Sequence, residues 1–100
     1  MTQIIISSSD SNKQDIVNKL VSGALERERR ILQSAIEKTQ LNLNAFEEKY
    51  SKSSVQFFED YKQGTAGDSD DIIDWAGEYQ IYLDLKNKLD SLEDIVVEHK

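Results

Sequence analysis

Residues 72–96 read IIDWAGEYQIYLDLKNKLDSLEDIV and decide the fold. Apolar side chains recur there in steps of three and four residues, so their mean spacing of about 3.4 is close to one helical turn. The members of this row are Ile72, Trp75, Tyr79, Tyr82, Leu85, Leu89, Leu92 and Val96. The pattern predicts a long helix over residues 70–98 with one apolar face.

A second helical pattern occupies residues 12–51. From Leu32 onward its apolar steps alternate between four and three, with Thr39 as the one polar member, which is close to a heptad seam. Glu28 interrupts the upstream part, so ordinary helix packing is expected rather than a long coiled coil. The chain contains no proline, so neither pattern meets a residue that would break a helix.

A short third helix is predicted between the two long ones. Ser53 and Gln56 have the spacing of a capping box, in which side chains satisfy the free amides of a helix start. This helix should run for about three turns and end near Gly64, because residues 64–67 are typical of a turn. Residues 68–71 would then cap the last helix. Its apolar side is formed by Val55, Phe57, Phe58 and Tyr61.

These patterns predict an all-α fold in which two long helices form an antiparallel hairpin, with a short intervening helix completing a three-helix arrangement. The chain has 100 residues, which suits one domain. We assign residues 12–100 to that helical domain. Residues 1–11, which include the β-branched run Ile4-Ile5-Ile6, are expected to be a flexible or short-strand tail.

All of the net charge lies in the second half of the chain. Residues 1–50 contain seven acids and seven bases, whereas residues 51–100 contain twelve acids and five lysines, which gives the net charge of −7. An acidic half favours a basic protein partner. Nucleic acid is not an expected ligand, because binding phosphate requires a basic surface.

Composition also bears on compartment and chemistry. The chain has no cysteine, so disulfides and thiolate metal sites are excluded, and no apolar run reaches the length of a membrane span. The N-terminus lacks the basic and apolar regions of a signal peptide. We therefore expect a cytoplasmic protein with no membrane association.

Candidate catalytic and metal-binding residues are few. His99 is the only histidine and lies one residue from the end, where a shielded catalytic environment is not expected. The acids of residues 68–74 do not form a calcium loop, because Ile72 and Ile73 occupy the fifth and sixth positions. No glycine-rich phosphate loop is present. We expect no enzyme activity, no cofactor and no metal.

All eight aromatic residues lie within residues 46–82. One interpretation places Phe46, Phe57 and Trp75 in the core where the helices meet. The other interpretation places some aromatics on a partner surface, where Trp and Tyr often dominate binding. The acids of residues 68–74 either complement the positive end of the last helix or contact the same partner. The candidate partner-binding residues are Phe58, Tyr61, Asp70, Asp71, Asp74, Trp75, Glu78 and Tyr79.

Helix lengths predict a self-association surface. At 1.5 Å per residue the long helices would measure roughly 57 and 43 Å, so an antiparallel hairpin would leave part of the first helix overhanging. Exposed apolar rows of this kind usually contact another chain. We expect a homo-oligomer or an obligate heterocomplex. Gly77 is expected to allow close approach of another backbone. The basic residues of the first helix either pair within that helix or contact the acidic half of a second copy; they are Arg27, Arg29 and Arg30. The overhanging residues are Ile16, Val17, Leu20 and Val21.

The segment FEEKYSKSSVQF at residues 46–57, continued by Gly64, the acids of residues 68–71 and Trp75, resembles a group of small helical proteins. These proteins, from archaea and cyanobacteria, carry a Phe-Glu-x-Lys-Tyr, Ser-x-x-x-Phe, Gly…Asp, Trp pattern and look like the antitoxin-side partners of TumE-type toxins. The resemblance covers roughly residues 27–95. It implies stoichiometric binding of a cognate protein without enzyme activity. A self-associating scaffold protein is the alternative.

Overall fold

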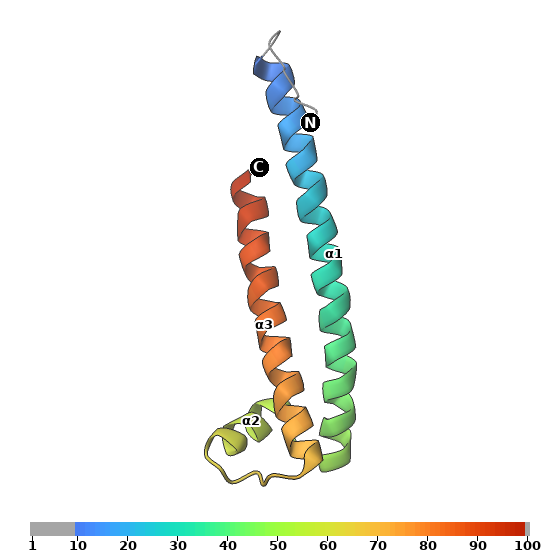
Figure 1. Ribbon diagram of the computed structural model, residues 1–100, viewed down its shortest axis with the longest axis vertical. Helices are drawn as coiled ribbons and strands as arrows, with labels where there is room; N and C mark the ends of the chain where they lie inside the picture. Colours follow the sequence, from blue (N-terminus) through green and yellow to red (C-terminus); the bar gives the residue numbers. More distant parts are fainter. Residues whose placement is uncertain (1–9, 100) are drawn as a thin grey trace, which may run out of the picture.

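The computed structural model describes residues 10–99, and these residues form three helices (Figure 1). Helix α1 spans Asp10–Tyr50, α2 spans Ser54–Lys62 and α3 spans Asp70–His99. Helices α1 and α3 lie side by side and antiparallel, with α2 at the closed end of the hairpin. The predicted all-α arrangement is confirmed. Residues 10 and 11 belong to α1 and not to the tail, and the rest of the predicted tail lies outside the described residues.

The closed end holds an aromatic core around Trp75, whose side chain is 1% exposed. The ring of Phe57 lies parallel to the indole at 3.8 Å between centroids, while the rings of Phe46 and Tyr50 stack on it at 5.6 Å. Large aromatic surfaces dominate a small core when they pack in this way. The core interpretation of Phe46, Phe57 and Trp75 is therefore confirmed for the single chain.

Helix α2 is held on this core by hydrogen bonds through Ser54. Helix α1 ends where Ser51 adopts a left-handed conformation, with φ 53°. Ser53 then caps α2, as predicted, by accepting a hydrogen bond from the Gln56 amide. The buried Ser54 hydroxyl accepts from Trp75 Nε1 at 2.9 Å, and its amide donates to a Glu47 carboxylate oxygen at 2.8 Å. Both groups avoid the cost of an unpaired buried polar atom.

The connection from α2 to α3 follows the predicted turn chemistry. Gly64 has φ 77° and Gly67 has φ 97°, a region that side chains with a Cβ rarely adopt. Within residues 68–71, it is the hydroxyl of Ser69 that accepts from the Ile72 amide at 3.4 Å. The turn therefore returns the chain to the start of α3.

The other end of the hairpin is an arm made only of α1 and α3. Its buried hydrophobic residues are Leu32, Leu89 and Leu92. Helix α1 continues past the end of α3 (Figure 1), as the predicted helix lengths require. In the overhang Ile16, Val17 and Leu20 are exposed, and Val21 is half-buried. None of the described helices offers an apolar stretch long enough to cross a bilayer.

Candidate protein-binding surfaces

The predicted partner-binding residues do not form one site. Successive residues of a helix are about 100° apart, so Gly77 and Tyr79 point to nearly opposite sides of α3. Tyr79 contacts Phe58 of α2, whereas Gly77 lines a groove between α3 and α1 together with Asp74 and Glu78. The predicted set is thus divided between two faces of the hairpin.

On the α2 side, four rings form a continuous surface that we call the aromatic patch. It consists of Phe58, Tyr61, Tyr79 and Tyr82. Phe58 stacks on Tyr61 at 6.0 Å and meets Tyr79 at 5.1 Å, and Tyr79 stacks on Tyr82 at 6.1 Å. Tyr61 is exposed and the other three are half-buried, so each ring has a packed side and an accessible side. Such preordered aromatic rings suit a binding anchor, because little side-chain entropy remains to be lost.

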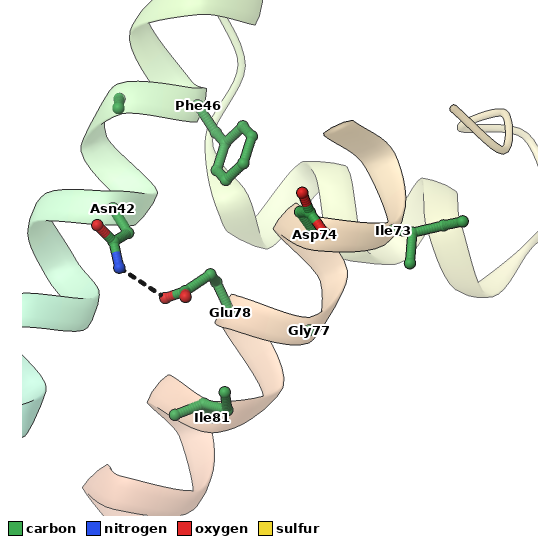
Figure 2. A pocket seen from close by; sticks show the side chains of 8 residues that line it. Asn42, Phe46, Ile73, Asp74, Gly77, Glu78 and Ile81 are labelled. Atoms are coloured by element: carbon green, nitrogen blue, oxygen red, sulfur yellow. Dashed lines mark hydrogen bonds between the residues drawn. The ribbon is translucent and has the colours of Figure 1, made fainter. Parts of the chain in front are cut away.

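Between α1 and α3, on the side away from α2, lies the groove shown in Figure 2. We call it the α1–α3 groove; its volume is about 530 Å³. Ile73 and Ile81 are 54% and 51% exposed along α3, with Gly77 between them. Asn42 on α1 donates a hydrogen bond to Glu78 at 3.2 Å across the groove. The full lining is Asn42, Ala45, Phe46, Ile73, Asp74, Gly77, Glu78 and Ile81.

The prediction that Gly77 allows close approach of another backbone is wrong for the single chain. A Cβ atom added at Gly77 would meet no described atom within 4 Å. The residue instead deepens an open groove, since the missing side chain leaves space between two isoleucines. Any close neighbour at this position would have to come from outside the described residues.

Two of the predicted partner contacts have a role inside the chain. Trp75 is buried in the core, so its side chain is not accessible to a partner. Asp71 accepts hydrogen bonds from Lys49 Nζ and from the Tyr50 hydroxyl, both at 2.6 Å, which ties the end of α1 to the start of α3. These bonds lower the pKa of Asp71, with Lys49 contributing most, and the bond to Asp71 raises the pKa of Tyr50.

The remaining predicted acids are available at the surface. Asp70 and Asp74 are exposed on the first turns of α3, and Glu78 is half-buried beside Asn42. Among residues 10–99, no group of three or more potential metal-binding side chains gathers in one place. The acids therefore supply a negative field along the α1–α3 groove rather than a ligand set.

Sequence reasoning missed the exposed isoleucines Ile73, Ile81 and Ile95, of which the first two line the α1–α3 groove. They are all about half exposed and fall outside the main apolar row of α3. Their separations of eight and fourteen residues place them within one broad side of the helix, which is a second apolar row. That spacing was the signal that could have identified the groove.

The fold and its surfaces define a small helical hairpin closed at one end by a short third helix, with features suited to binding other proteins. Comparison of the chain with protein-family models, with curated proteins and with solved structures gives no match.

Proposed function

We propose that this chain is a cytoplasmic, non-enzymatic protein-binding module. The observation that carries the proposal is its exposed apolar surface: among the described residues, twelve large hydrophobic side chains are exposed, and they include Ile16, Val17 and Leu20 in the overhang and Ile73 and Ile81 in the α1–α3 groove. Single exposed apolar residues are ordinary, but contiguous exposed apolar surface is typical of sites that bind another protein. No catalytic step and no cofactor are part of this proposal.

The aromatic patch is the proposed anchor for a cognate protein. Partially exposed Tyr and Phe rings at the centre of an interface commonly supply a large share of the binding energy. The acids Asp70, Asp74 and Glu78 lie on the other side of α3, so their role toward this partner is long-range attraction of a basic surface rather than contact. Trp75 is excluded from the contact set by its burial, whereas Asp71 is bound within the chain by Lys49 and Tyr50.

The resemblance to antitoxin-side proteins makes a small basic toxin the proposed partner. In that role the chain would bind its toxin stoichiometrically and cover the toxin's working surface. Coexpression with the product of the neighbouring gene tests this directly. We expect a stable complex and rescue of growth; loss of viability despite normal expression of this chain would contradict the antitoxin role.

Matched variants locate the contact. Tyr61→Ala removes an exposed ring of the aromatic patch, and Val55→Ala removes an exposed side chain from the same helix outside the patch. We expect Tyr61→Ala to weaken the complex by about tenfold or more, with little effect from Val55→Ala. Circular dichroism confirms that both variants fold. Equal affinities for both variants would remove the aromatic patch from the proposal.

A second candidate is a self-associating scaffold protein. It is favoured by the overhang of α1, where Ile16, Val17 and Leu20 are 43%, 40% and 63% exposed. In this case the partner is another copy, and the neighbouring gene product is irrelevant. A homodimer that ignores the coexpressed neighbour would favour the scaffold over the antitoxin.

A further inference from the structure

One side of α3 carries a row of exposed isoleucines along its length, with a glycine and a lysine between them. On α3, Ile73, Gly77, Ile81, Lys88 and Ile95 follow one another in steps of four, four, seven and seven, which keep them on one side of the helix. Tyr79, two residues from both Gly77 and Ile81, lies on the opposite side and contacts α2. We call the side away from α2 the open face.

The open face is hollowed at both ends. The α1–α3 groove lies near the closed end, and a second hollow of about 320 Å³ lies in the arm, between Leu32 of α1 and Leu92 and Ile95 of α3. Because α3 lines both hollows with the same row, the two open toward the same side. A long helical partner could occupy both at once.

Helix α1 extends this face into the overhang. Arg27 precedes Ala45 of the groove by eighteen residues, or about five full turns, and therefore lies on the same line of α1. Leu20 precedes Ala45 by twenty-five residues, close to seven turns, so it also lies near this line. Leu20 is 63% exposed and Ile31, beside Arg27, is 61% exposed. The overhang and the open face are thus one continuous surface, in which exposed apolar side chains lie among charged ones.

The two ends of this surface differ in charge. At the closed end, Asp74 and Glu78 line the groove, and Asp70 lies one heptad before Gly77. Toward the other end, Arg27 and Arg30 flank Ile31 in a further hollow of about 440 Å³. Lys88 and Glu28 line the second hollow together, so their charges offset one another locally. The surface is acidic at the closed end and basic near the start of the overhang.

We propose that a second copy of this chain docks antiparallel on the open face, forming a two-fold dimer in which four long helices pack together. A two-fold rotation about an axis perpendicular to the long helices places Arg27 and Arg30 of one copy opposite Asp74 and Glu78 of the other. The symmetry repeats this contact at the other end of the dimer. A parallel copy would bring like charges together. The same rotation places the exposed Ile31 and Leu20 against the isoleucines of the α1–α3 groove.

The size of the surface is sufficient for such a dimer. The molecule measures 65 × 26 × 20 Å. A specific interface needs about 800 Å² from each partner, which is roughly a tenth of the accessible surface of 7487 Å². Gly77 would then have the close neighbour that residues 10–99 do not provide. This inference deepens the self-association candidate and does not depend on the aromatic patch, which stays free in the dimer.

Sedimentation across the micromolar range, with a matched pair of variants, tests the inference. Ile81→Asp places a charge in the groove, and Leu83→Asp places one on the other side of α3, two residues away; both side chains are exposed in the single chain. We expect a wild-type dimer whose dissociation constant rises about tenfold or more with Ile81→Asp and changes little with Leu83→Asp.

Charge reversal and cross-linking test the orientation. Arg27→Glu with Arg30→Glu, and separately Asp74→Arg with Glu78→Arg, should each weaken the dimer, and mixing the two variants should restore a heterodimer. The chain has no cysteine, so a single introduced one reports its own neighbourhood. A short bismaleimide should join copies carrying Lys88→Cys, which lies near the proposed axis, but not copies carrying Ile73→Cys.

Each alternative result contradicts a specific part of the dimer proposal. A wild-type monomer throughout the range contradicts the dimer, and leaves the cognate-protein proposal to the coexpression experiment. A dimer that is indifferent to Ile81→Asp contradicts the open face while keeping self-association. Cross-linking through both introduced cysteines contradicts the antiparallel orientation.

Discussion

The closed end and the arm are built from the same two helices but differ in what covers them. At the closed end, α2 adds a third layer, and Trp75 is enclosed by the rings of Phe46, Tyr50 and Phe57. In the arm, two helices share a strip of leucines, and no third element covers them in the described chain. A helix pair buries one stripe from each member, so a small third helix changes the burial greatly.

This difference shows which part of the molecule buries its core within one chain and which part leaves apolar surface exposed. The closed end satisfies its buried polar groups through the Glu47–Ser54–Trp75 hydrogen bonds. The arm leaves the overhang of α1 and its own part of the open face to solvent. The closed end should therefore fold without help, whereas the arm should gain stability from a partner.

The largest effect is expected from Trp75→Ala. Removing the central indole leaves a cavity between three rings, and such substitutions cost about 3–5 kcal/mol. Urea unfolding followed by circular dichroism at 222 nm measures the loss, a wavelength chosen because helix dominates its signal. A cost below about 1 kcal/mol would show that the closed end is not the main source of stability.

A smaller loss is expected from Leu92→Ala in the arm. Leucine truncation in cores costs about 2–5 kcal/mol, and the lower limit applies here because a two-helix strip can close partly over the gap. The variant should be measured at low protein concentration, so that association does not mask the loss. A cost equal to that of Trp75→Ala would remove the distinction between the two regions.

Ser54→Ala tests the hydrogen bonds that seat α2. The change leaves Trp75 Nε1 buried without its partner, at a cost of about 1–2 kcal/mol. Trp75 is the only tryptophan, so its emission should also shift if α2 moves away. Ser53→Ala, which removes only the N-cap contact, is the matched control and should leave the emission unchanged. Identical spectra for all three proteins would indicate that the Ser54 bond does not position α2.

The smallest effect on stability is expected from the hydrogen bonds that Lys49 and Tyr50 donate to Asp71. The pKa of Asp71 is lowered by its bonds to Lys49 and Tyr50, so its contribution is present above its unfolded value of about 4 and is lost as pH falls through the folded value. The pKa values of Tyr50 and Lys49 are raised, so their contribution is lost as pH rises beyond about 10.

Thermal unfolding of wild type and Tyr50→Phe across pH measures how much the Tyr50–Asp71 hydrogen bond contributes to stability. The phenylalanine keeps the ring on Trp75 and removes the bond to Asp71. The difference in Tm should be small, because exposed pairs are screened by solvent, and it should shrink at both extremes of pH. A difference that grows as Asp71 is protonated would contradict the assignment.

Much of the fold could be predicted from the sequence, for reasons that are visible in particular residues. The row from Ile72 to Leu92 fixed α3, the spacing of Ser53 and Gln56 fixed the start of α2, and Gly64 fixed the turn after it. These signals are local, because helix period, capping and turn conformation depend on neighbouring residues.

The candidate surfaces were less predictable because they depend on which side of a helix is covered. The sequence grouped Asp74, Glu78 and Tyr79 by proximity, but the position of α2 separates Tyr79 from the two acids. Asp71 was expected at a partner surface, yet its bonding depends on where Lys49 and Tyr50 arrive from the end of α1. Such contacts between distant segments have no signature in spacing alone.

Hydrogen exchange at two protein concentrations tests the contrast between the regions most directly. Amides of residues 54–69, in α2 and the turn after it, should exchange at the same rate in dilute and concentrated samples, because this part of the closed end packs within one chain and lies away from the open face. Amides of residues 16–36 and 85–95 should become more protected as concentration rises. Full and concentration-independent protection of the arm in a monomeric sample would contradict the account.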